Sequence, residues 1–165
     1  MAMTLVSTVT VGSGGATNIE FTGIAGTGKD LMLLVSGRNT SSNFMRVRPN
    51  NDTTAANYAR RRLYGDGSSV GSDSWAFGDV GYFGDLRLGS SSSTANTFGN
   101  ALIYITNYAA SAAKSLMADT LNENNATAAD QQIDAGIWNS TAAITSLVLI
   151  GNFAQHSTAS LYIIS

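Results

Sequence analysis

The sequence contains no cysteine, so neither a disulfide framework nor a thiolate metal site can hold the fold together. It has a single proline, Pro49, and only 12% of its 165 residues are charged. A typical soluble domain carries about 25% charged residues, whereas this chain is rich in glycine and in short, neutral polar side chains. So little charge lowers solubility, and we expect part of the surface to be covered in an assembly.

Long hydrophobic runs are also lacking, and none approaches the roughly 20 residues that a membrane-spanning helix needs. The chain length fits one domain of the usual size, roughly 100–200 residues. No change in composition, linker or internal repeat divides the sequence. We therefore expect a single domain over residues 1–165, without a membrane partner, whose stability rests on its own core and on subunit contacts.

The hydrophobic residues that are present recur mainly with a period of two, which is typical of β-strands. Clusters of Gly, Ser, Asn and Asp separate the hydrophobic segments, and about ten strands in this pattern predict an all-β fold, an antiparallel sandwich of two sheets. Short helical pieces are expected only within residues 51–62 and 108–114. The expected strands are Thr4–Val11, Asn18–Phe21, Asp30–Ser36, Phe44–Arg48, Arg62–Tyr64, Asp73–Phe77, Val80–Phe83, Thr97–Ile105, Lys114–Asn122, Gln131–Trp138, Ile144–Ile150 and Ser157–Ile164, of which the sixth and seventh are weaker because glycine interrupts them.

The segment Gly23–Lys29 has the spacing of a phosphate-binding loop. Such a loop requires Ser or Thr after the lysine to bind Mg²⁺, but Asp30 stands at that position and would repel phosphate. The loop must also open a helix, whose N-terminal N–H groups bind phosphate, whereas Leu31–Val35 has the pattern of a strand. We interpret the segment as a glycine-rich turn between two strands.

His156 is the only histidine, and no G-x-S-x-G motif accompanies it, so a Ser-His-Asp site has little support. Asp66, Asp73, Asp79 and Asp85 are spaced too widely for a calcium loop, in which the ligands alternate. A glycosidase pair of carboxylates stays open, because it depends on spacing in the folded chain. The commoner role of Asp near Gly and Ser is to cap turns. Nothing here predicts an enzyme, a cofactor or a metal site.

The charges are unevenly distributed along the chain. Residues 1–62 hold seven basic and three acidic residues, a charge of +4, and residues 63–165 hold two basic and eight acidic residues, a charge of −6, which gives the net −2. Identical subunits could therefore pair basic with acidic surfaces. The negative net charge argues against a nucleic-acid partner. The basic residues concentrate at Arg46, Arg48, Arg60, Arg61 and Arg62, which we predict to form a protein interface with carboxylates; a solvated patch without function is the other interpretation.

Several segments of the chain resemble a known type of module. The first is Thr94–Tyr108, the second is Asn124–Ala128 followed by Ala135–Ser146, and the third is Gly151–Tyr162. In the first half of the chain, Phe21–Ile24, Asp30–Leu31 and Arg62–Gly67 fit the same pattern. As a set, these segments resemble a β-sandwich module of tailed-bacteriophage virions, which occurs alone or as a terminal domain of larger virion proteins.

The resemblance implies a structural virion protein of the decoration or cement type, on the exterior of the capsid. Its expected partners are the major capsid protein and itself, as a jelly-roll-like homotrimer seated where capsomers meet. The family has no catalytic residues to transfer to this sequence. Related modules also occur in tails and fibres, so the alternative is an adhesion module that binds host glycans through Trp75, Trp138 or surface tyrosines.

Overall fold

The computed structural model describes residues 2–41, 44–123 and 129–165. Asn124–Ala128, part of one segment of the phage resemblance, lies outside these residues. Within the described ranges the chain forms twelve strands and one 3-10 helix, η1 (Ala55–Asn57). The strands are β1 (Met3–Thr10), β2 (Ala16–Phe21), β3 (Asp30–Gly37), β4 (Phe44–Pro49), β5 (Tyr58–Gly65), β6 (Val70–Trp75), β7 (Gly84–Arg87), β8 (Gly99–Ile105), β9 (Lys114–Asn122), β10 (Asp130–Trp138), β11 (Leu147–Phe153) and β12 (Thr158–Ile164).

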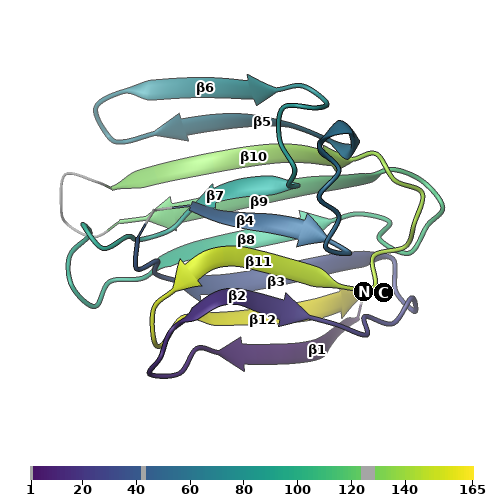
Figure 1. The fold of residues 1–165 in the computed structure, drawn as a ribbon, viewed down its shortest axis with the longest axis horizontal. Coiled ribbons are helices and arrows are strands. Elements are labelled where there is room, and N and C mark those ends of the chain that lie inside the picture. The colour runs from purple at the N-terminus through teal and green to yellow at the C-terminus, as the bar shows by residue number, and fades with distance from the viewer. Residues whose placement is uncertain (1, 42–43, 124–128) are drawn as a thin grey trace.

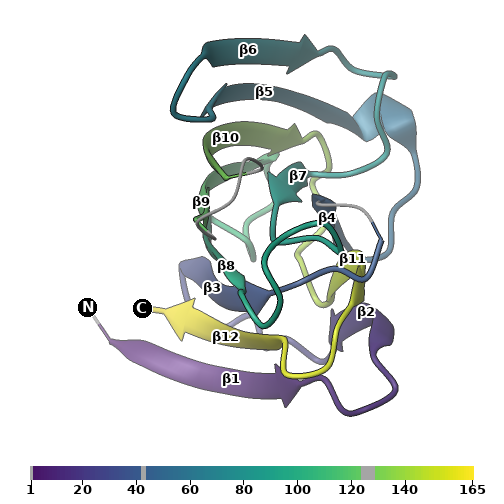
Figure 2. The ribbon, with the colours of Figure 1, turned by 90° about the vertical axis from the view of Figure 1, so that its left-hand side faces the viewer.

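The strands form two facing antiparallel sheets, which confirms the predicted all-β sandwich. The large sheet has eight strands in the order β1-β12-β3-β8-β9-β10-β5-β6, and the small sheet has the order β2-β11-β4-β7. The small sheet lies in front of the large one in Figure 1, and Figure 2 shows the large sheet curving around it. No helix of the described residues is long and apolar enough to span a membrane.

Eight of the strands have the order of a jelly roll. Strands β1-β12-β3-β8 form one half and β2-β11-β4-β7 the other, so that successive strands of this frame alternate between the two sheets, except for β4 and β7, which are neighbours in the small sheet. Two hairpins are inserted into this frame: β5–β6 between β4 and β7, and β9–β10 between β8 and β11. In the large sheet, β9 pairs with β8 and β5 pairs with β10, and β5 and β6 extend beyond the small sheet (Figure 1).

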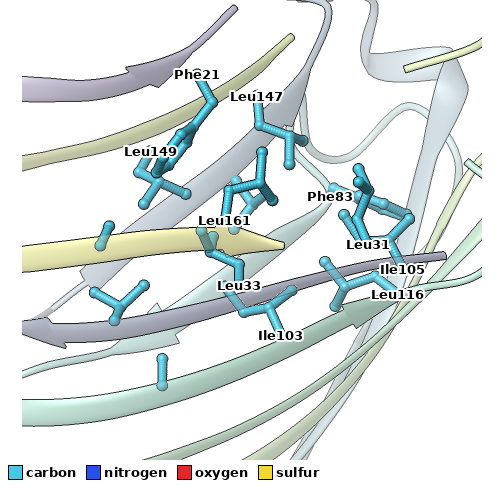
Figure 3. Packing of buried hydrophobic residues seen from close by; sticks show 14 of the residues in the cluster. Phe21, Leu31, Leu33, Phe83, Ile103, Ile105, Leu116, Leu147, Leu149 and Leu161 are labelled. Carbon is cyan, nitrogen blue, oxygen red and sulfur yellow. The ribbon is translucent and has the colours of Figure 1, made fainter. Parts of the chain in front are cut away.

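The core lies between the sheets and follows from the period-two pattern. In β3 the side chains of Leu31, Leu33 and Val35 point inward and are at most 4% exposed. They meet Phe21 and Leu149 of the small sheet in one continuous hydrophobic cluster (Figure 3). Each such side chain contributes about 1.5–3 kcal/mol of hydrophobic stabilisation. The core can therefore stabilise the fold without disulfides.

Two local predictions were wrong, and one was right only in part. The short helical piece expected within residues 51–62 is η1, but residues 58–62 belong to β5, which begins before the predicted Arg62 because Tyr58, Arg60 and Arg62 alternate toward the interior. Residues 108–113 form turns, with Tyr108 buried in the core. Residues 80–83 are not a strand; the short edge strand is β7, which begins where Phe83 donates its backbone N–H to the carbonyl of Val47.

Candidate protein interface

The five arginines predicted to form an interface lie on two strands and do not share one surface. In β5, Arg60 and Arg62 point inward and are 2% and 9% exposed, whereas Arg61 points outward. On β4, the side chain of Arg46 is half exposed, and Arg48 donates from Nε to the carbonyl of Gly81. Arg60 and Arg62 are therefore used inside the subunit, and a contact with another protein stays a prediction for the other three.

Arg60 is the centre of a charged network between the sheets. Its Nη2 lies 3.2 Å from Oδ2 of Asp85 on β7, and its Nη1 lies 3.3 Å from Oδ1 of Asp134 on β10. Its guanidinium also stacks on Trp75 of β6, 3.4 Å from the ring centroid. Asp85 receives a second contact, from Nε of Arg46 at 3.3 Å. Arg60 thus ties the edge of the small sheet to the inserted hairpins of the large sheet.

Two more ion pairs continue this network. Arg62 pairs with Asp73 of β6, and Nη1 of Arg87 on β7 lies 3.0 Å from Oδ2 of Asp130 on β10. The ring of Tyr64 lies under both guanidiniums, at 4.9 and 5.1 Å. Four arginines and four aspartates therefore balance within one subunit, so much of the charge asymmetry along the chain is compensated internally.

Burial perturbs the carboxylates of this network. It raises the pKa of Asp134 to about 6, against the opposing effects of the hydrogen bond from Gln132 and the charge of Arg60. Burial also raises the pKa of Asp130, which the contact with Arg87 counteracts. Among the described residues, several buried polar atoms of the network have no hydrogen-bond partner, including Nε of Arg60 and Oε1 of Gln132. Such a network adds little to the free energy of folding, because the cost of removing the charges from water offsets much of their attraction.

The segment Gly23–Lys29 connects β2 with β3 and leads into a strand, not a helix. Asp30 begins that strand and accepts hydrogen bonds from the hydroxyl of Tyr104 at 2.6 Å and the backbone N–H of Asn107 at 2.8 Å. The geometry is that of an anchored turn, without the helix N-terminus that a phosphate site needs.

The other residues weighed for catalysis have local structural roles. His156 lies in an exposed turn with φ 72°. Asp66 accepts hydrogen bonds from the backbone N–H groups of Ser68 and Ser69, which lower its pKa, and Asp79 accepts one from the N–H of Ala76. Asp73 and Asp85 belong to the charged network. In the part of the chain that the structure describes, no group of three or more His, Asp or Glu residues is placed to hold a metal ion.

The two tryptophans are poorly placed to bind a sugar. Trp138 is 2% exposed, and its Nε1 donates to Oδ2 of Asp52 at 2.8 Å. Asp52 also accepts from Asn57 and Thr54, and these hydrogen bonds lower its pKa to about 2 although burial acts in the opposite direction. Trp75 is partly buried against the guanidinium of Arg60.

Sequence reasoning missed an exposed apolar surface on the large sheet. We call it the outer face and define it by Leu34, Leu63, Leu102, Met117, Leu121 and Ile133, which are 38–57% exposed and lie on the side of the sheet away from the core. The signal was present in the sequence. In β9, for example, Met117 and Leu121 fall between inward-facing residues, on the side where a solvated strand carries polar residues.

Comparison with known proteins finds no family model that matches the chain and no curated protein that matches its sequence. Fold alone is a weak guide, because jelly rolls serve many functions.

Proposed function

We propose that the protein is a structural component of a bacteriophage virion. In this proposal it decorates the exterior of the capsid and stabilises the shell by bridging major capsid subunits, as a homotrimer. The resemblance of the sequence segments to phage virion modules supports the proposal, as does the jelly-roll order of eight strands, an architecture common among viral capsid proteins.

The observation that carries the proposal is the outer face of the large sheet. Monomeric proteins rarely expose large contiguous apolar patches, and such patches mark sites of protein contact. Here the exposed residues come from neighbouring strands: Leu34 and Leu102 are direct cross-strand partners, and so are Ile133 and Leu63. A protein whose function is to assemble needs a surface of this kind.

The interior charges suit a mechanical role. The network around Arg60 connects β4 and β7 of the small sheet with β10, β5 and β6 of the large sheet. Such cross-links resist the shearing of one sheet over the other, a useful property in a clamp between capsid subunits. A trimer would contact several capsid subunits at once, and each added contact strengthens the attachment through a high effective concentration.

Rebinding to capsids tests the proposal. Phage capsids that lack the protein are mixed with the purified chain, and bound protein is measured after the capsids are sedimented. We expect saturable binding to the capsid exterior and a higher temperature of capsid disruption. Absence of binding would contradict the proposal, and binding only to host glycans on an array would replace it with the adhesion alternative.

A further inference from the structure

Arg61 and Asp119 lie on the outer face of the large sheet, and neither has a hydrogen-bond or ion-pair partner in the part of the chain that the structure describes. The other arginines all have one. Arg46, Arg60, Arg62 and Arg87 form ion pairs, and Arg38 and Arg48 donate to backbone carbonyl groups.

Both residues point outward on the large sheet and flank β10. Cross-strand register places Arg61 of β5 opposite Ala135 of β10, and places Asp119 of β9 opposite Ile133 of the same strand. The two residues are thus two strands and two register positions apart. Standard strand dimensions put their Cα atoms about 12 Å from each other, which explains why they do not pair within one subunit.

Apolar side chains surround both charges. Ile133 lies between Asp119 and Leu63 across the strands, and these two hydrophobic residues are each 52% exposed. Met117, on the same strand as Asp119, is 57% exposed, and Ala135 separates it from Arg61. A partner that covers the apolar residues must therefore also cover the two charges.

This requirement restricts the partner. Burying an unpaired charge is costly, so a protein that covers the outer face must place a cation at Asp119 and an anion at Arg61. Nucleic acid or an anionic membrane would satisfy Arg61 but repel Asp119. A copy of this chain carries both charges, at the same spacing and within the same apolar surface.

We propose that the outer face is the surface by which copies of this chain pack on one another, with Arg61 of one subunit paired with Asp119 of its neighbour. Every subunit supplies one charge of each sign, so the pairs are all satisfied in a closed symmetric oligomer. This inference names the self-association surface within the proposed function, and its test is separate from capsid binding.

Charge reversal tests the pairing. The mass and dissociation constant of the full chain are measured by analytical ultracentrifugation for the wild type, Arg61→Asp, Asp119→Arg and the double variant. We expect the wild type to be oligomeric and each single reversal to weaken association by about tenfold or more. The double variant should recover most of the wild-type affinity, because it restores opposite charges.

Lys29→Asp and Glu20→Arg are the matched controls. Both residues are exposed, lie off the outer face and have no partner among the described residues, so these variants should associate like the wild type. Circular dichroism confirms that each variant is folded, and Met117→Lys, which disturbs the apolar part of the face, should weaken association too.

A monomeric wild type would overturn the inference, as would single reversals that associate normally or a double variant as weak as the single ones. A dimer that passes the charge-reversal test would support the surface and contradict the proposed trimer. Capsid binding by a monomer would support capsid decoration but overturn both the trimer and this inference, so the decoration and the self-association surface can fail separately.

Discussion

The buried side chain of Lys114 holds two loops together. Its ammonium nitrogen is fully buried and lies 2.6–3.3 Å from four backbone carbonyl oxygens, those of Ala110, Ala112, Ser140 and Ala142, which share its three N–H donors. Burial lowers the pKa of this lysine. The loop before β9 is thereby fastened to the loop that follows β10.

Replacing Lys114 with methionine keeps the length of the side chain but leaves the four carbonyl groups without their donor. An unsatisfied buried polar group costs about 1–3 kcal/mol, so we expect Lys114→Met to lower the free energy of unfolding by about 3 kcal/mol or more in urea denaturation. Lys29→Met, at an exposed lysine, should stay within about 0.5 kcal/mol of the wild type. Equal stability of the two variants would show that the contacts with the carbonyl groups make no net contribution to the free energy of unfolding.

Asp134 should make the stability of the protein depend on pH. Its pKa is about 6 in the folded chain and about 3.9 when unfolded, so between these values the folded state binds more protons. The contribution of Asp134 to the free energy of unfolding therefore falls as the pH rises from about 4 to about 6 and is constant above that range. The side chains of Arg60, Gln132 and Asp85 face the carboxylate of Asp134 and influence its pKa.

Asp134→Asn removes this titration while keeping an oxygen for Arg60. We expect the variant to show a flatter pH dependence than the wild type between pH about 4 and about 6, measured by urea unfolding at a series of pH values. Glu20→Gln, at an exposed carboxylate, is the control and should follow the wild type. An unchanged curve for Asp134→Asn would mean that the carboxylate titrates near its ordinary pKa.

Part of this residue-level picture was accessible from sequence. Once residues 58–65 form a strand, the period of two separates Arg61 from Arg60 and Arg62, and only the first can face outward. The partners of Arg60 could not be predicted from the sequence. Asp85 and Asp134 lie 25 and 74 residues away in the chain, and strand register, which no local pattern encodes, brings them together.

At the scale of elements, β10 depends on a close approach by the segment before β7. A Cβ atom at Gly136 would lie 2.2 Å from the carbonyl oxygen of Phe83, which is backbone and cannot move aside. We expect Gly136→Ala to destabilise the protein by about 1–3 kcal/mol through overpacking, measured as a lower midpoint of urea unfolding. Gly12→Ala adds a Cβ where nothing lies within 4 Å and should have little effect; equal loss in both variants would contradict this account.

Strands with clear alternation were predicted well, and those shaped by distant contacts were not. β9 and β10 occupy nearly the expected residues, and inward and outward positions alternate along both strands, although the outward positions of β9 include the apolar Met117 and Leu121. The segment 108–113 was misread as helical because its run of small residues favours helix locally, whereas buried Tyr108 and Lys114 fix it as turns. A strand was predicted at Val80–Phe83 instead of at β7, because residues 84–87 become a strand through their pairing with β4, which no local pattern shows.

At the scale of the whole molecule, the inserted hairpins convert a jelly roll into an asymmetric sandwich. The large sheet has eight strands and the small sheet has four. The outer face of the large sheet carries the exposed apolar residues together with Arg61 and Asp119. Composition pointed to an assembling protein and periodicity to a sandwich. The alternation in β9 places apolar residues on both sides of that strand, but the order of the strands is needed to show that the outward ones gather on one uncovered face.

The most direct test of the account is the position of the protein in an intact phage particle, seen by cryo-electron microscopy. The account predicts ordered density for the jelly roll with its inserted hairpins on the outside of the shell, in contact with more than one major capsid subunit. Density only at the tail or fibres, or a particle that lacks the protein altogether, would contradict it.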